Sequence, residues 1–193
     1  MVIKMRDELF DELKRHLSNS HYQFQEIAHA KQVLNYAEQL VDPERSSRRI
    51  VVPSSILHDI ANYDPRFKDP QTLLRYIEDL MGKYGYTPEE SGKIVRCMIR
   101  HSRRSTETPE TIDEKVVFDA DNLTILTPYG IVRWFFMAKE WGNVITMERA
   151  VQDLLEIRKQ IERGELFYTK TGLRLAQNNR WFLEYTEKLS EML

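Results

Sequence analysis

Cysteine is nearly absent from the sequence, since Cys97 is the single one among 193 residues. One cysteine excludes a disulfide within the chain and a cysteine-rich zinc site, and it fits a reducing cytosol. Glycine is also scarce, with seven residues, and no glycine-rich phosphate loop of the Walker or Rossmann type occurs in the sequence. If the protein binds a nucleotide, it therefore needs another device to hold the phosphates.

Long hydrophobic runs and a large net charge are missing as well. No run approaches the roughly 18 apolar residues of a membrane span, and residues 1–10 are charged rather than signal-like. The formal charge of −2 gives no reason to expect a nucleic acid polymer or an anionic membrane as a partner. We therefore expect a cytoplasmic protein, and its length suits one domain with a sizeable core.

Helix signals, by contrast, are abundant. Helix starts are marked where a capping residue precedes proline, which occurs at Asp42, Asp69, Thr87 and Thr108. Convincing strand alternation is hard to find, so the sequence predicts an all-α fold. The predicted helices lie near residues 3–18, 22–41, 52–62, 70–84, 88–102, 110–126, 130–141, 146–163 and 171–191.

The stretch from Val52 to Tyr63 combines an apolar helix with two polar side chains. Pro53 fits a first helical turn, where its missing N–H costs nothing, so a helix is predicted to begin near it. His58 and Asp59 lie among aliphatic residues of this helix, and burying such groups unpaired is costly. A divalent cation would satisfy both side chains. The alternative is a histidine–aspartate pair that caps or hydrogen-bonds a helix end.

Two further histidines fall on apolar helix faces. His29 shares a face with Val33 and Leu40, because residues three and four apart are neighbours on a helix. His101 lies on the apolar side of the predicted helix 88–102, at its C-terminal end. Each histidine also has an explanation that needs no metal. His29 could be a hydrogen-bonded core residue, and His101 could interact favourably with the negative end of the helix macrodipole.

One of two nearby aspartates is predicted to face the core. Asp119 and Asp121 are about 200° apart around the predicted helix 110–126, so only one of them is expected to point inward. The apolar neighbours Val117 and Leu123 favour Asp121 as the buried acid. The alternative for Asp121 is a carboxylate that caps a neighbouring helix.

Taken together, four inward polar groups in an otherwise apolar bundle predict a bound cation, because bundle cores commonly build metal sites from facing helices. The imidazoles of His29 and His58 and the carboxylates of Asp59 and Asp121 form a mixed nitrogen and oxygen set. That set suits Mn²⁺, Mg²⁺, Fe²⁺, Co²⁺ or Ni²⁺. Because imidazole must be neutral to ligate, we expect metal occupancy to fall below about pH 6.

The order of these residues resembles that of the HD-domain metal-dependent phosphohydrolases. Residues 29–33 look like that family's first-histidine helix, although Gln32 stands where arginine is common, and residues 56–60 match the His-Asp signature. Residues 99–102 and 111–123 resemble segments of a small bacterial subgroup of single-domain predicted HD hydrolases. The resemblance covers nearly the whole chain.

This resemblance implies an HD-domain helical bundle with a C-terminal helical hairpin, formed as a single domain over residues 1–193. The metal-site core is expected over about residues 20–142, with the hairpin over about residues 144–193 packed on it. The implied activity is hydrolysis of a phosphate ester or anhydride by metal-activated water. A nucleotide is the leading substrate class, and Mn²⁺ or Mg²⁺ is the leading cofactor. Exposed aromatic residues near the C-terminus would allow a homodimer.

The resemblance also assigns roles to particular residues. His29, His58, Asp59 and Asp121 would hold the metal ion. His101 would stabilise developing charge or protonate the leaving group, with Asp59 as the second catalytic residue. The candidate phosphate-facing cations are Lys31, Arg103, Arg104 and Arg133.

Two departures from the subgroup keep other functions open. Asn62 follows the His-Asp pair where an acidic residue is common, and Asn122 replaces the usual arginine after Asp121. One alternative is therefore a catalytically weak module of the same fold, which binds a nucleotide or a partner and keeps a structural metal. The other is a di-iron oxygenase of the HD type, which uses iron redox chemistry and would need further ligands.

Overall fold

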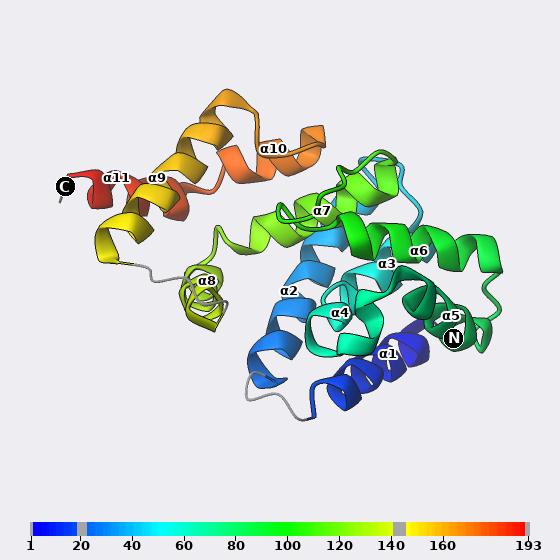
Figure 1. The fold of residues 1–193 in the computed structure, drawn as a ribbon. Coiled ribbons are helices and arrows are strands. Elements are labelled where there is room, and N and C mark those ends of the chain that lie inside the picture. The colour runs from blue at the N-terminus through cyan, green and yellow to red at the C-terminus, as the bar shows by residue number, and fades with distance from the viewer. Residues whose placement is uncertain (1, 19–22, 141–145, 192–193) are drawn as a thin grey trace.

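The computed structural model describes residues 2–18, 23–140 and 146–191 (Figure 1). Over these ranges the chain forms eleven α-helices and one 3₁₀ helix and no strand, which confirms the predicted all-α fold. The helices are α1 (Val2–His16), α2 (Gln23–Val41), α3 (Arg48–Leu57), α4 (Ile60–Tyr63), the 3₁₀ helix η1 (Pro65–Lys68), α5 (Pro70–Gly82), α6 (Pro88–Arg100), α7 (Ile112–Thr124), α8 (Pro128–Glu140), α9 (Met147–Arg163), α10 (Lys170–Gln177) and α11 (Arg180–Ser190).

Several predicted boundaries lie outside the described residues. These are the start of the predicted metal-site core at residues 20–22, its end at residues 141–142, the start of the hairpin at residues 144–145 and its end at residues 192–193. The division of the chain into a core and a hairpin therefore stays a prediction.

The predicted helix starts are half right. Asp69 accepts a hydrogen bond from the Thr72 backbone N–H and begins α5, and Thr87 forms a capping box that begins α6. The other two predictions are wrong, because the chain turns after Asp42 and does not enter a helix at Thr108. Helix α7 begins after Thr111 instead, where the side chains of Thr111 and Glu114 close a second capping box.

Two predicted helices are interrupted. The segment near residues 52–62 starts earlier than expected, at Arg48, so that Pro53 lies inside α3, and it breaks between α3 and α4. The segment near residues 171–191 divides into α10 and α11, because Asn179 accepts a hydrogen bond from the Phe182 backbone N–H and starts a new helix. Amphipathic spacing continues across both breaks, so the sequence pattern does not reveal them.

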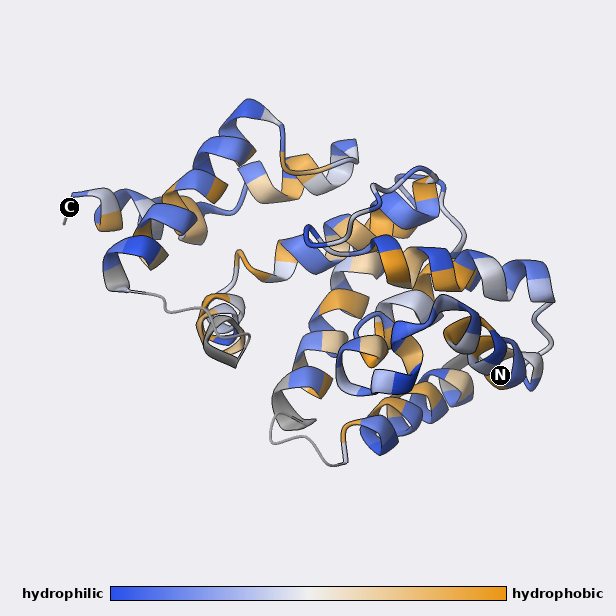
Figure 2. Ribbon diagram, in the orientation of Figure 1, coloured by the Kyte–Doolittle hydropathy of each residue, from blue (hydrophilic) through white to orange (hydrophobic). Residues whose placement is uncertain are grey.

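Helices α2, α3 and α7 form the centre of the bundle. Helix α2 packs against α7 and α3, and α3 also packs against α6 and α1. Hydrophobic and hydrophilic segments alternate along these helices, as amphipathic helices require (Figure 2). The fully buried side chains include Leu40, Ile56, Ile60, Ile94 and Leu123. Among the described helices, none combines the length and the apolar character that crossing a membrane requires.

The last three helices lie together at one end of the molecule (Figure 1). Helices α10 and α11 both contact α9, and α10 also contacts α7. On α11, Trp181 and Tyr185 stack on each other with ring centroids 5.3 Å apart, and both are exposed. These are exposed aromatic residues of the kind that would allow a homodimer, which stays a prediction.

Asp119 corrects one expectation about α7, namely that Asp121 is the buried acid of the pair: Asp119 is 0% exposed, whereas the side chain of Asp121 is 21% exposed. The Asp119 side chain is fully buried. Its carboxylate is satisfied there by hydrogen bonds from the backbone N–H groups of Tyr168 (2.9 Å) and Thr169 (2.8 Å), just before α10. Burial raises the pKa of Asp119 to about 6, although these N–H groups oppose the rise. Helix α7 is covered on two sides, so Asp119 anchors the C-terminal helices while Asp121 faces another way.

The same anchor requires a glycine on α10, and this gives a stability prediction. A Cβ atom added at Gly172 would lie 2.5 Å from Asp119 Oδ2. We expect Gly172→Ala to lower the free energy of unfolding by about 1–3 kcal/mol through overpacking. Gly92→Ala is the matched control, because nothing lies within 4 Å of its Cβ position, and it should add about 0.5–1 kcal/mol. Urea denaturation of both variants measures the difference, and equal stabilities would contradict the close contact.

Candidate metal centre and its cavity

The break between α3 and α4 positions two of the candidate ligands. His58 follows α3 with helical backbone angles, whereas Asp59 (φ −94°, ψ 2°) leaves the helix and precedes α4. In a continuous helix, neighbouring side chains point about 100° apart. The change of backbone direction lets His58 and Asp59 meet at one place, where His29 of α2 and Asp121 of α7 also arrive.

Hydrogen bonds to backbone carbonyls orient two imidazoles in the same way. His58 Nδ1 donates to the Ser55 carbonyl oxygen at 2.9 Å, and His101 Nδ1 donates to the Met98 carbonyl oxygen at 2.6 Å. In the neutral ring, a proton on Nδ1 leaves a lone pair on Nε2. This arrangement is common for metal-ligating histidines, since it fixes both the tautomer and the direction of the ring.

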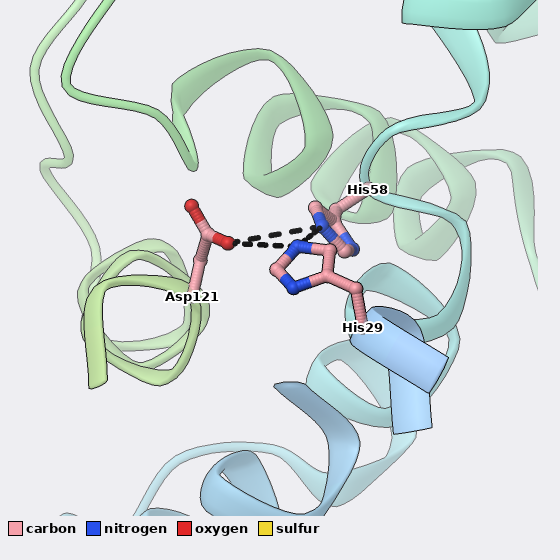
Figure 3. Close-up of side chains that lie close together, drawn as sticks. All are labelled: His29, His58 and Asp121. Carbon is pink, nitrogen blue, oxygen red and sulfur yellow. Dashed lines mark hydrogen bonds and ion pairs between the residues drawn. The ribbon is translucent and has the colours of Figure 1, made fainter. Parts of the chain in front are cut away.

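The candidate ligand atoms converge on a small volume. His29 Nε2 lies 3.0 Å from His58 Nε2 and 3.1 Å from Asp121 Oδ1, and the three side chains point toward one another (Figure 3). Asp59 Oδ2 lies 3.2 Å from His58 Nε2 and 3.6 Å from His29 Nε2. Adjacent donors around an ion at about 2.1 Å are roughly 3 Å apart in an octahedron. The donor types and the spacing both fit a divalent cation.

The charges of the cluster also favour a cation. Burial lowers the pKa of His58, but the carboxylates of Asp59 and Asp121 outweigh it and raise that pKa to about 9. For His29 burial prevails, with the positive charge of Arg133, and its pKa is lowered. Burial opposes ionisation of Asp59 and Asp121, yet the neighbouring imidazoles hold the pKa of each carboxyl below its ordinary value. Both acids are therefore ionised at neutral pH.

Metal binding should release a proton from His58. The cation needs the Nε2 lone pair, and the raised pKa keeps that nitrogen protonated until about pH 9. Mn²⁺ affinity should therefore fall as the pH is lowered, by up to about tenfold per unit between pH 8 and pH 6. Titration of Mn²⁺ by electron paramagnetic resonance at several pH values measures this. A pH-independent affinity would contradict ligation by His58.

A cavity of about 970 Å³ opens beside the cluster. His58, Asp59, Asp121 and His101 line it together, and His101 Nε2 lies 3.3 Å from Asp59 Oδ1. The cationic residues of the lining are Lys68, Arg103, Arg104 and Arg133. Apolar side chains of the lining include Phe67, Leu73, Trp134, Met137 and Ile157. The cavity thus combines a polar, charged wall with apolar surface, as small-molecule sites commonly do.

The predicted phosphate-facing cations are placed unequally. Arg103, Arg104 and Arg133 line the cavity, whereas Lys31 is exposed on α2 and is not among its described lining residues. Arg103 donates from Nη2 to Gln160 Oε1 at 3.2 Å.

Two departures from the family pattern have defined contacts. Asn62 donates from Nδ2 to Asp59 Oδ1 at 2.5 Å, so its amide helps to orient a candidate ligand. Asn122 donates from Nδ2 to the Phe118 carbonyl oxygen at 2.9 Å, within its own helix. Both side chains line the cavity.

Sequence reasoning missed Glu26 and Lys68. Glu26 is only 2% exposed and accepts two hydrogen bonds from Arg133. Glu26 lies one helical turn before His29 and therefore on the same face of α2. This spacing could have indicated from the sequence that Glu26 lies near the candidate ligands. Lys68 ends η1, and no sequence pattern placed η1 beside the cavity that the candidate metal ligands line.

Comparison with known proteins defines the class of fold. No protein-family model matches the chain. Its fold is that of the HD-superfamily hydrolases, as the resemblance predicted. An HD-superfamily hydrolase from Bacillus thuringiensis superposes with a TM-score of 0.69 at 20% identity, over 100% of this chain and 98% of that chain.

The chain is similar in particular to YpgQ of Bacillus subtilis. The two sequences are 23% identical over 169 residues, which cover 84% of this chain and 82% of YpgQ. The crystal structure of YpgQ superposes with a TM-score of 0.71 at 21% identity, over 99% of this chain and 96% of YpgQ. YpgQ also has a crystal structure in complex with ADP. At these identities the likeness shows a shared fold.

Proposed function

We propose that this protein is a metal-dependent phosphohydrolase that cleaves a phosphate ester or anhydride bond, with a nucleotide as its substrate. The observation that carries the proposal is the convergence of two imidazole nitrogens and two carboxylates at the wall of a cavity that also presents arginines. The ADP complex of YpgQ supports the substrate class, because that protein has the same fold.

In this proposal His29, His58, Asp59 and Asp121 hold the cation, with Mn²⁺ or Mg²⁺ as the leading choice. A divalent cation in such a site supplies a coordinated water of lowered pKa and polarises a phosphoryl oxygen. The chain's own contribution is to fix the ligands by the hydrogen bonds of His58 and Asn62 and to exclude bulk water from the buried side of the cluster.

His101 is the proposed proton donor or charge stabiliser. Its Nδ1–H is engaged by the Met98 carbonyl, so Nε2 is the atom that exchanges a proton with a ligand in the cavity. Asp59 Oδ1 lies 3.3 Å from that nitrogen. A protonated Nε2 can stabilise charge on phosphoryl oxygens or protonate the leaving oxygen.

Arginines of the cavity are the proposed phosphate contacts. Arg103, Arg104 and Arg133 lie in its lining, and a guanidinium matches the oxygens of a phosphate group by its fork of N–H donors. Lys68 belongs to the same lining. Lys31 is left out of this proposal, because it is exposed and stands apart from the described lining.

A substrate panel tests the proposal. Nucleoside mono-, di- and triphosphates and simple phosphate esters are incubated with Mn²⁺, Mg²⁺, Co²⁺ or Ni²⁺, and phosphate or pyrophosphate release is measured for the wild type and for Asp121→Asn. We expect metal-dependent release by the wild type alone. ADP and metal binding without turnover would favour the binding module instead. Iron-dependent oxygen consumption, absent under anaerobic conditions, would favour the oxygenase.

A further inference from the structure

The Arg133 guanidinium is divided between two carboxylates and the cavity. Nε donates to Glu26 Oε1 at 3.1 Å, and Nη2 donates both to Glu26 Oε2 at 2.7 Å and to Asp59 Oδ2 at 3.1 Å. These bonds use three of the five N–H groups of an arginine. The two on Nη1 have no hydrogen-bond partner among the described residues, and Arg133 lines the cavity. They are free to donate to a ligand there.

Glu26 has the geometry of a residue that serves this arginine. Its carboxylate is buried on α2, one turn before His29, and its two oxygens each accept one N–H of Arg133. A fork-to-fork pair of this kind fixes the plane of the guanidinium as well as its position. The orientation of Nη1 in the cavity therefore depends on Glu26.

Charge balance gives a second reason for the pair. A divalent cation would be neutralised by Asp59 and Asp121, so without the Glu26 carboxylate Arg133 would face a positive centre with no compensating charge of its own. Its guanidinium would then turn fully onto Asp59, which is the nearest remaining carboxylate at 3.1 Å. With the Glu26 carboxylate in place, Arg133 bonds Asp59 through one N–H of Nη2 only, which leaves Nη1 for a ligand.

We propose that Glu26 is a positioning residue, which locks Arg133 so that Nη1 contacts a phosphate oxygen of the substrate while Nη2 orients Asp59. This inference deepens the proposed function and rests on it. The ligand chemistry is a phosphate group next to the candidate metal ligands, contacted by the N–H groups of Nη1 on a guanidinium that two carboxylates hold in place.

Glu26→Gln tests the proposal in the Mn²⁺-loaded protein. The amide retains the shape of the side chain but offers one acceptor and places an NH₂ group against the guanidinium. We expect the dissociation constant for ADP, measured by equilibrium dialysis, and the KM of the substrate found in the panel to rise about tenfold. The kcat should change less than the KM. Glu12→Gln is the matched control, since Glu12 is a buried acid outside the cavity lining.

A double variant separates positioning from simple stability. If Glu26 acts through Arg133, adding Glu26→Gln to Arg133→Met should raise the ADP dissociation constant no further. Glu26→Asp, which keeps the carboxylate, should recover part of the affinity and serves if Glu26→Gln folds poorly. Wild-type ADP affinity in Glu26→Gln, or additive losses in the double variant, would overturn the inference while the wild type remains active. A wild type that neither binds ADP nor turns over substrate would overturn the proposed function and this inference with it.

Discussion

Asp121→Ala is expected to abolish divalent-cation binding and hydrolysis together. The Asp121 carboxylate lies 3.1 Å from His29 Nε2, and in the proposed site it would contribute one of the two negative charges that balance the ion. Loss of an outer partner of a metal ligand already costs about 10–100-fold in affinity, so loss of the ligand itself should cost more than about a hundredfold. Isothermal titration with Mn²⁺ and the substrate assay measure both effects in the same preparation.

Asp119→Ala is the matched control for that experiment. It removes a carboxylate from the same helix, two residues away, but from the face that anchors α10 rather than the face that meets the histidines. Metal affinity should stay within a few-fold of the wild type, whereas the free energy of unfolding should fall by about 1–3 kcal/mol because two buried N–H groups lose their acceptor. Equal loss of metal from both variants would refute the assignment of faces on α7.

His101→Gln is expected to lower kcat by about 10²–10⁴-fold while one divalent ion still binds. This range is typical of a removed general acid or base. His101 Nε2 contacts Asp59 Oδ1 at 3.3 Å, whereas the atoms that meet His29 are Asp59 Oδ2 and Asp121 Oδ1. Its removal should therefore spare the ion held by the other residues. Glutamine keeps a polar side chain of similar size and cannot carry the proton.

Metal stoichiometry distinguishes two roles for His101. His58, Asp59 and His101 also form a group whose ligand atoms lie within 4.8 Å of one another. If the wild type binds two ions per chain and His101→Gln binds one, His101 is a ligand and the proton-donor role is wrong. His16→Gln is the control, because His16 is bonded to Asp64 and Tyr76 outside the cavity lining, and its kcat per folded molecule should equal that of the wild type.

Local patterns were sufficient for much of the fold. The capping residues before α5 and α6 are read directly from neighbouring side chains, because the hydrogen bonds involved span three residues. Apolar spacing likewise located α2, since one buried face per helix leaves a periodic trace. The same spacing put His29 and Asp121 on inward faces, and the structure brings their side chains within 3.1 Å of each other.

The sequence by itself thus determined an all-α chain, its principal helices and the set of polar groups that a bundle core must satisfy. Only the tertiary structure decided that α3 breaks after Leu57, that Asp119 is as buried as any core residue, and that Glu26 clamps Arg133 across 107 positions of the chain. The physical reason is the separation along the chain between the residues that interact. Caps and helix faces depend on residues a few positions apart, whereas a buried carboxylate is stabilised by whichever N–H groups the folded chain brings to it, and no local pattern encodes those partners.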